Sequence, residues 1–338
     1  MPKITIQIET LVEKDGKKYV RIQEPAVEDG VTLEYNKRGS AAKLTFTCIK
    51  DRDWNGDVMA EGGLSFPEGA KVSLYYDEKQ VFFGYVFEKS RNKEHHIEVT
   101  CYDRTFYFKN KKNYIFTNAT LDQIVTRVAE DMGVPVGSIS KSKYVIPKLA
   151  KELTSVFDVL DTAVGLTTIG GGEEFILYDE AGKLYLKSRD EMQLNLYIDK
   201  DTFEDFDYST SIDGNTYNRI VVKDSKKSEI HVFDDKNSQQ KFGVLQMEVD
   251  LPEGGNSKEI AMQRLQAHQY VSRSFSVNGH FGDIRVRGGS GVYVDHSMLG
   301  DMPRQVQKMW VQSVTHTFNH NEHVMDMTLI DGKGFYSE

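Results

Sequence analysis

Cysteines, prolines and long apolar runs are all scarce in this chain of 338 residues. It contains 2 cysteines and 7 prolines, which excludes a disulfide-stapled scaffold, a collagen-like repeat and a proline-rich linker protein. The longest apolar stretch, counting glycine, covers residues 81–87, far short of the roughly 18 residues of a membrane-spanning helix. The first residues alternate polar and apolar side chains, unlike a secretory signal. We therefore expect no membrane insertion and a protein made in the cytoplasm.

An excess of positive charge is also missing. The chain has 42 Lys and Arg against 51 Asp and Glu, a formal net charge of −9. A surface that neutralises a phosphate backbone has the opposite balance, so we expect no specific nucleic-acid binding. Hydrophobic residues make up 39% of the chain and charged residues 28%, which excludes a disordered protein. The length suggests two or three folded domains of about 150 residues each.

Segments that alternate polar and apolar residues fill the first hundred positions. They are rich in Val, Ile, Thr, Tyr and Phe and are separated by turn residues, which is typical of antiparallel strands. The expected strands cover residues 3–9, 17–23, 31–35, 42–49, 72–76, 81–88 and 95–102. Cys48 and Cys101 fall on apolar positions, and we expect both to be packed as free thiols. This pattern predicts a small β-barrel or β-sandwich.

The apolar period changes to about 3.6 at Thr120, which predicts a helix. Thr120 and Gln123 can form a capping box, and Gly133 can end the helix. A second helix is expected to begin at Ser155 and to end before the glycines at 170–172, followed by a hairpin of residues 174–178 and 183–187. Residues 111–200 are therefore expected to form a mixed α/β segment.

The strand pattern returns after Asn218. Expected strands cover residues 219–223, 229–233, 244–249, 284–286, 306–318 and 323–330. Asn256 and Glu259 can cap one helix that runs to about residue 273. The predicted fold class is mainly β with an α+β insert: β-barrels in 1–110 and 201–338 around the mixed 111–200. In an alternative arrangement, residues 200–250 pair back with the first barrel.

Two groups of side chains have the chemistry of metal ligands. Asp51, Asp53 and Asn55 occupy positions 1, 3 and 5 of a calcium-type loop, but position 12 is a glycine instead of a glutamate. They are weak calcium candidates, and a polar turn explains them better. His316, His320 and His323 have the chemistry of zinc ligands, but their spacing favours a hairpin with ordinary strand histidines.

Motifs of known catalytic chemistry are missing. There is no Gly-x-Ser-x-Gly elbow, and the glycine clusters at 170–172 and 288–291 lack the Lys-Ser/Thr ending of a phosphate loop. We predict no catalytic residue, no cofactor and no cofactor-binding residue.

Several segments, taken in order, resemble the XkdQ/YqbQ-type family of phage-like baseplate hub proteins, relatives of late control protein D. The similarity covers most of the chain. It includes Phe-Gly-Tyr-Val at 83–86, Cys-Tyr-Asp-Arg-Thr-Phe-Tyr-Phe-Lys-Asn at 101–110, Gly-Val-Pro-Val-Gly at 133–137, Tyr-Asn-Arg-Ile-Val-Val at 217–222, Phe-Gly-Val-Leu-Gln at 242–246 and His-Thr-Phe at 316–318.

The resemblance implies a structural hub of a contractile-tail baseplate, in a phage or a phage-tail-like bacteriocin. Such hubs are homotrimers. Two tube-protein-like barrels per subunit adapt the hexameric tail tube to the trimeric spike around an axial channel. The implied partners are the tail tube protein, the spike protein, baseplate wedge proteins and the tape measure protein. The implied location is the cytoplasm during assembly and then the baseplate of the finished particle. An acidic channel would let DNA pass without binding it.

Two functions from other classes remain as alternatives. A tail-associated cell-wall hydrolase would need carboxylates that face each other across a cleft. A glycan-binding or receptor-binding β module would need an exposed aromatic platform, whereas the aromatic residues here mostly fall at the spacing of strand cores.

Overall fold

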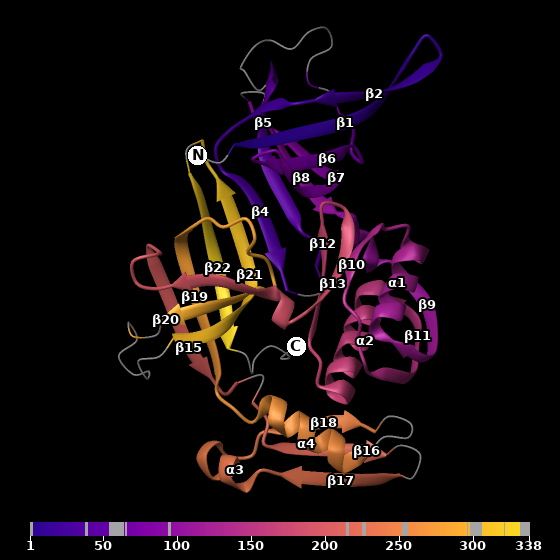
Figure 1. Ribbon diagram of the computed structural model, residues 1–338, viewed down its shortest axis with the longest axis vertical. Coiled ribbons are helices and arrows are strands. Elements are labelled where there is room, and N and C mark those ends of the chain that lie inside the picture. Colours follow the sequence, from indigo (N-terminus) through magenta and orange to yellow (C-terminus); the bar gives the residue numbers. More distant parts are fainter. Residues whose placement is uncertain are drawn as a thin grey trace.

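The computed structural model describes residues 3–37, 40–53, 64, 66–93, 96–213, 216–224, 228–251, 256–295, 297, 306–320 and 322–331, and it consists mainly of β-strands (Figure 1). The mainly β class is thereby confirmed. In the described part of the chain, no helix combines the length and the apolar composition that crossing a membrane requires.

The first part of the chain forms eight strands of a large sheet. They are β1 (Ile4–Lys14), β2 (Lys17–Gln23), β3 (Pro25–Val27), β4 (Val31–Asn36), β5 (Lys43–Asp53), β6 (Lys71–Tyr76), β7 (Lys79–Arg91) and β8 (Ile97–Asp103). Their antiparallel pairing runs in the order β4, β5, β8, β7, β6, β1, β2. The seven strands predicted from alternation are present. Only β3 was not predicted, because three residues are too few to display a period.

The last part of the chain continues the same sheet. Its strands are β14 (Gln193–Ile198), β15 (Asp205–Ser211), β19 (Ser272–Phe281), β20 (Gly291–Asp295), β21 (Val306–Phe318) and β22 (His323–Asp331). β21 pairs with β22 on one side and with β4 on the other, so that Val31 lies opposite Phe318. This seam joins both ends of the chain into one 14-stranded sheet.

One apolar core extends across both parts of the sheet. It combines Leu33 and Phe46 from the first part with Phe275 and Met327 from the last. Cys48 and Cys101 are buried free thiols, as predicted. The closure of each part into a barrel, with boundaries at 110 and 200, stays a prediction.

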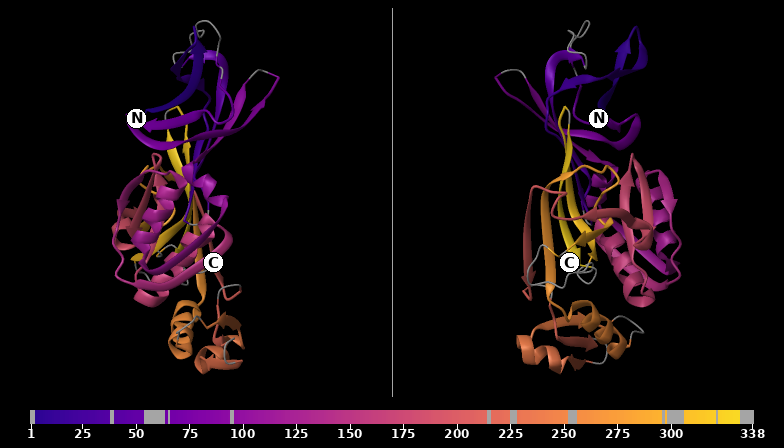
Figure 2. Two further views of the ribbon diagram at one scale, coloured as in Figure 1. Left: turned by 90° about the vertical axis from the view of Figure 1, so that its right-hand side faces the viewer. Right: turned by 60° about the vertical axis from the view of Figure 1, so that its left-hand side comes forward.

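Between β8 and β14 the chain leaves the large sheet and forms the mixed insert. Its elements are η1 (Arg104–Lys109), β9 (Lys111–Thr120), α1 (Leu121–Met132), β10 (Val136–Ile139), β11 (Val145–Ser155), α2 (Val156–Gly171), β12 (Phe175–Glu180), β13 (Lys183–Ser188) and η2 (Asp190–Met192). The insert has its own apolar core. Figure 2 shows it lying beside the large sheet.

The sequence predicted the two ends of α1 correctly and the end of α2 incorrectly. The predicted capping box of Thr120 and Gln123 is present, and Gly133 ends α1 in the left-handed conformation. The expected end of α2 before the glycines was wrong, because α2 includes Gly170 and Gly171. A Cβ at Gly170 would lie 2.0 Å from the Cζ atom of Tyr144. Close packing against this ring therefore explains that glycine better than a turn.

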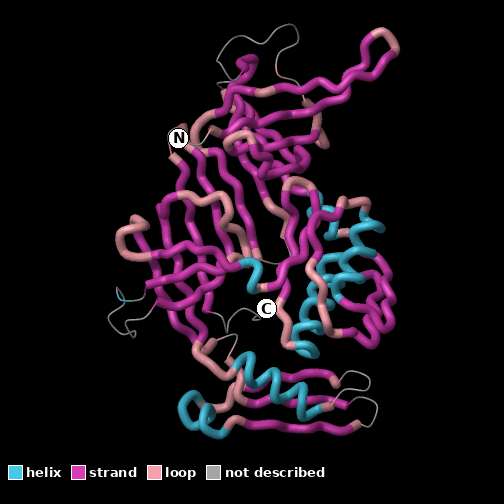
Figure 3. The backbone as a smooth tube through the Cα atoms, in the orientation of Figure 1, coloured by secondary structure: helices cyan, strands magenta, loops and turns pink. Residues whose placement is uncertain are grey.

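A small separate unit interrupts the last part of the sheet between β15 and β19. It consists of β16 (Arg219–Asp224), β17 (Glu229–Asp234), α3 (Lys236–Phe242), β18 (Gln246–Asp250) and α4 (Ser257–His268). Its three strands pair only with one another, and β15 pairs with β19. The described strands within 200–250 therefore do not pair with the first part of the chain. Figure 3 shows the longer helices gathered in the insert and in this unit.

Two expectations in the last part need correction. Residues 284–286 form a turn and not a strand, because the Asp283 carboxylate accepts a hydrogen bond from the Arg285 backbone N–H at 3.0 Å and the Asp283 carbonyl accepts one from Val286. The helix capped by Asn256 ends at His268, and β19 begins at Ser272. The unpredicted helix α3 has only seven residues, too few to show an apolar stripe.

Candidate functional site

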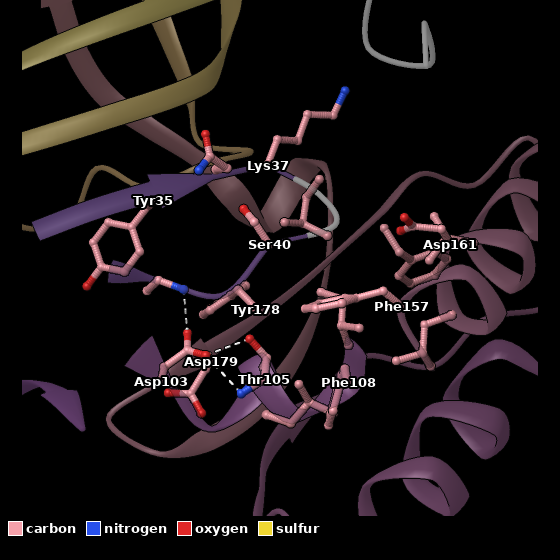
Figure 4. Close-up of a pocket in the computed structure, with 18 residues that line it drawn as sticks. Tyr35, Lys37, Ser40, Asp103, Thr105, Phe108, Phe157, Asp161, Tyr178 and Asp179 are labelled. Carbon is pink, nitrogen blue, oxygen red and sulfur yellow. Dashed lines mark hydrogen bonds between the residues drawn. The ribbon is translucent and has the colours of Figure 1, made fainter. Parts of the chain in front are cut away.

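A buried polar junction holds the insert against the large sheet, and Asp103 is its first member. Asp103 ends β8 and caps η1, where its Oδ1 accepts hydrogen bonds from the Thr105 backbone N–H at 2.8 Å and hydroxyl at 2.6 Å. Its Oδ2 accepts from the Ala42 N–H at 2.8 Å. One carboxyl group therefore connects the start of β5, the end of β8 and the first turn of the insert (Figure 4).

The junction joins three segments: Asp103 belongs to the first part of the chain, Asp179 to the insert and Arg287 to the last part. Asp179 lies on β12, where its Oδ1 accepts a hydrogen bond from Gly182 N–H at 2.8 Å. Arg287 follows β19 and donates from Nη1 to the Asp179 carbonyl at 3.0 Å. Its guanidinium lies 4.3 Å from the ring centre of Tyr178 and 5.0 Å from that of Tyr35. Arg287 is thus a buried cation shared by all three segments.

Burial dominates the protonation of this junction. It raises the pKa of Asp103 to about 6, although the hydrogen bonds from Thr105 and Ala42 and the charge of Arg287 oppose the shift. Burial, followed by the neighbouring charge of Asp103, raises the pKa of Asp179 well above its usual range. Figure 4 shows the two carboxyl groups side by side. Two carboxyl groups in such surroundings favour a state in which one is protonated.

A cavity of about 50 Å³ adjoins the carboxyl pair, between β4, β8, η1, α2 and β12. Paired carboxyl groups are the chemistry of glycoside hydrolysis. However, pockets that hold organic ligands are larger, about 300 to 1,000 Å³, and this cavity has room for only a few water molecules. The pair is therefore arranged to join segments and not to surround a sugar ring.

A second buried polar group lies inside the large sheet. His316 donates from Nε2 to the Val286 carbonyl at 2.9 Å, which leaves its Nδ1 to accept from Nε2 of His323 at 2.9 Å. Nδ1 of His323 then accepts from the hydroxyl of Tyr76 at 3.2 Å. This order of donors is the one that two neutral histidines make, with one N–H on each ring. Burial lowers the pKa of His316 and the pKa of His323 to about 4.

The proposed metal ligands are not gathered in the described part of the chain. His316 and His323 are adjacent, whereas His320 lies at the hairpin turn, and no group of three or more His, Cys, Asp or Glu side chains suited to a metal was found among the described residues. The backbone of Asp51 and Asp53 belongs to β5. Their side chains and Asn55 lie outside the described residues, so the calcium candidates stay a prediction.

A cluster of aromatic rings on the outer face of β7, β8 and η1 was not predicted from the sequence. Its members are Phe83, Tyr85, Phe87, Tyr102, Phe106 and Tyr107. Phe87 and Phe106 have ring centres 4.3 Å apart, and Lys109 lies 4.0 Å from the centre of Phe106. The rings are tilted onto one another, for example by 83° between Phe87 and Tyr102, so they form no flat platform for a sugar. Aromatic residues at 82, 83, 85 and 87 were the available signal, because they place rings on both faces of one strand.

Comparison with known proteins agrees with this fold. The YQBQ-like family model matches residues 31–330. The chain belongs to the YQBQ-like family. This YQBQ-like chain is 28% identical over 314 residues to the phage-like element PBSX protein XkdQ of Bacillus subtilis (strain 168), and the match covers 90% of this chain and 93% of XkdQ.

Solved structures of tail proteins share the fold of the YQBQ-like chain. The 43 kDa tail protein of prophage MuSo2 from Shewanella oneidensis is similar with a TM-score of 0.66 at 13% identity, over 98% of this chain and 99% of that one. The tail protein from Neisseria meningitidis MC58 is similar with a TM-score of 0.67 at 11% identity, over 99% and 98%. The resemblance stated from the sequence is thereby confirmed at the level of family and fold.

Proposed function

We propose that this YQBQ-like chain is a structural, non-catalytic part of a phage or phage-like tail, and that it acts as the hub of a contractile-tail baseplate. In this role three copies surround an axial channel and adapt a hexameric tail tube to a trimeric spike. Wedge proteins bind from outside, and the tape measure protein or DNA passes through the channel. The chain is made in the cytoplasm and ends in the baseplate.

The observation that carries the proposal is the extent of the likeness. The tail protein of prophage MuSo2 is matched over 98% of this chain and 99% of its own length, insert and small unit included. A likeness confined to the β-rich parts would indicate a common strand architecture and little more. Agreement over almost the whole of both chains supports a shared structural role.

Two properties of the molecule suit this role. The net charge of −9 disfavours binding of a phosphate backbone, so that DNA would pass a lumen without being retained. The buried carboxyl pair adjoins a cavity too small for a substrate and instead ties the insert to the sheet. The second property favours a rigid coupling piece over a hydrolase.

Deletion of the gene in cells that produce the tail tests the proposal directly. Negative-stain electron microscopy should then find no complete tails, and complementation with a tagged chain should restore them with the tag on the tail axis. Normal tails without the chain, or a tag away from the axis, would overturn the proposal.

A second experiment tests the hydrolase alternative. The purified chain is incubated with peptidoglycan, and soluble muropeptides are measured by chromatography. We expect no release above buffer. Release that disappears in an Asp103→Asn or Asp179→Asn variant with an unchanged circular dichroism spectrum would favour the enzyme.

A further inference from the structure

Two edge strands of the large sheet carry opposite charge. In the described part of the chain, its main strand order runs from β15 at one end to β2 at the other, and each of these strands has one neighbour; β3 and β14, which branch from this order, also have one neighbour each. β2 reads Lys-Lys-Tyr-Val-Arg-Ile-Gln, with three basic and no acidic residues, and β15 reads Asp-Phe-Asp-Tyr-Ser-Thr-Ser, with two acidic and no basic residues.

Natural edge strands are kept from pairing with other chains by short length, bulges, proline or charged side chains. Of these features, β2 and β15 have only the charged side chains. β2 and β15 each have seven residues without proline, and both pair with their neighbours in an unbroken register. Most of their side chains are exposed. Such edges are templates for another strand.

The β1–β2 hairpin also projects beyond the sheet that supports it. β1 pairs with β6 only as far as Glu9, while its pairing with β2 continues to Lys14. Figures 1 and 2 show the hairpin extending away from the body. On one face of this hairpin, Leu11, Val20 and Ile22 are 75%, 59% and 56% exposed. An aliphatic face this exposed is typical of a surface that a partner covers.

We propose that β2 of one copy pairs with β15 of the next copy, and that three such contacts close a ring. The inference rests on the trimeric hub proposed above and names the strands that form its interface. Pairing of two different edges is a head-to-tail contact, which gives a ring when the rotation between copies closes and does not give a two-fold dimer.

The charges select this arrangement over its alternatives. Pairing β2 with a second β2 would gather six basic side chains along one seam, and pairing β15 with a second β15 would gather four acidic side chains. Like charges across an interface disfavour association, whereas opposite charges favour it. Of these three pairings, only that of β2 with β15 brings opposite charges together.

The side chains on each face of β2 also match those on the corresponding face of β15. On β15, Phe206 and Tyr208 lie opposite the core residues Val277 and Phe275, so Asp205 and Asp207 point to the other face. On β2, Tyr19 shares the core face with Gln23, and Lys18 lies on the opposite face. A pairing that keeps the cores aligned brings Lys18 next to the aspartates and Tyr19 next to Phe206.

Disulfide trapping tests the contact. A chain with both Lys18→Cys and Asp207→Cys is oxidised, as purified protein and within assembled tails, and is then separated on a non-reducing gel. We expect covalent dimers and trimers and no larger species. An equal mixture of the two single variants should give dimers only, because each copy then has one reactive edge. The native Cys48 and Cys101 are buried and provide no competing thiols.

Charge reversal tests the selectivity. The pairs Lys17→Glu with Lys18→Glu, and Asp205→Lys with Asp207→Lys, should each weaken self-association at least tenfold in sedimentation experiments at low salt. All four substitutions in one chain should restore association, because the charges are exchanged and not lost. The control pair Lys111→Glu with Lys148→Glu changes as many exposed charges on β9 and β11 and should leave association unchanged.

The outcomes separate this inference from the hub itself. Trimers that survive both reversals, together with no covalent trimer from the double-cysteine chain, would overturn the β2–β15 contact and leave the hub intact. Tails that form normally without the gene would overturn the hub. If the double-cysteine chain forms no covalent trimer, either as purified protein or in assembled tails, the β2–β15 contact is wrong even if the chain is required for assembly.

Discussion

Two buried polar clusters lie in different regions of the molecule and have opposite responses to acid. The first is the carboxyl pair Asp103 and Asp179, where the insert meets the large sheet. The second is the histidine pair His316 and His323, inside the sheet itself. Burial is the largest cause of the pKa shift in both clusters, but it disfavours a negative charge in one and a positive charge in the other.

The carboxyl pair stabilises the fold less as the pH rises. The pKa of Asp103 increases from its usual 3.8 to about 6 on folding. The full contribution of Asp103 to stability is therefore present below pH 3.8, where its carboxyl group is protonated in both the folded and the unfolded state. This contribution is lost as the pH rises through 6. Asp179 shifts in the same direction.

The histidine pair changes in the other sense. The pKa of both residues falls from 6.5 to about 4 because burial disfavours the imidazolium. Their contribution is present above pH 6.5 and is lost as the pH falls toward 4. Mild acid therefore strengthens the attachment of the insert while it weakens the sheet, so each region can be tested by its own pH dependence.

Replacement of Arg287 should have the largest effect on stability, and it should act on the carboxyl cluster. Arg287→Met leaves two buried carboxyl groups without their shared cation, and we expect a loss of about 3 to 5 kcal/mol in unfolding free energy at pH 8. The loss should be smaller at pH 5, where protonation of Asp103 removes part of the negative charge. Urea unfolding at both pH values measures it.

Arg285→Met is the matched control, because Arg285 pairs with Asp283 on an exposed turn. We expect it to cost less than about 1 kcal/mol. An equal loss for Arg287→Met at both pH values would contradict the assigned role of the carboxyl charges.

Replacement of His323 should reduce the acid sensitivity of the sheet. In His323→Gln the side-chain amide can still donate to His316 and accept from Tyr76, but it no longer titrates. We expect the fall in unfolding free energy between pH 7 and pH 5 to shrink by about 2 kcal/mol. His320→Gln, at the hairpin turn, should leave that fall unchanged, and the same fall in both variants would reject the interpretation.

Neutralisation of Asp179 should stabilise the protein at high pH, because it removes one charge from the carboxyl cluster. Asp179→Asn keeps an oxygen for the Gly182 N–H and removes a carboxyl whose second oxygen has no hydrogen-bond partner in the described part of the chain. We expect a gain of about 1 to 2 kcal/mol at pH 8 and none at pH 4. Thermal unfolding measures the difference, with Glu130→Gln on the exposed side of α1 as the control. A gain of the same size at pH 4 would exclude an origin in the carboxyl charge.

The smallest expected effect concerns the insert alone. A Cβ at Gly165 in α2 meets no atom within 4 Å, so Gly165→Ala should stabilise the insert by about 0.5 to 1 kcal/mol. Hydrogen exchange should show slower exchange in α1 and α2 and unchanged exchange in β21 and β22. Gly84→Ala is the contrasting variant in the sheet, because its Cβ would lie 2.2 Å from the Tyr102 carbonyl oxygen, and it should destabilise. Slower exchange throughout the chain would show that insert and sheet open together.

Local features were predictable from the sequence, and contacts between distant segments were not. Alternation located β2 to the residue, and Thr120, Gln123 and Gly133 marked both ends of α1. Asp103, Asp179 and Arg287 lie far apart in the chain, and no spacing rule relates them. Only the strand order brings them together.

The separate status of the small unit was hidden for a related reason. Its strands alternate as the sheet strands do, and period alone does not tell which sheet a strand joins. Its pairing depends on the parallel contact of β16 with β18, which a hairpin pattern does not suggest.

The seam between β4 and β21 has a consequence during synthesis. β4 emerges from the ribosome long before β21, the strand that completes its ladder with Phe318 opposite Val31. Until then the nascent chain carries an open hydrogen-bonding edge and an uncovered apolar surface, a state in which β-rich chains are prone to aggregate. Cells that produce this protein would therefore benefit from a chaperone that shields β4 until β21 has been made.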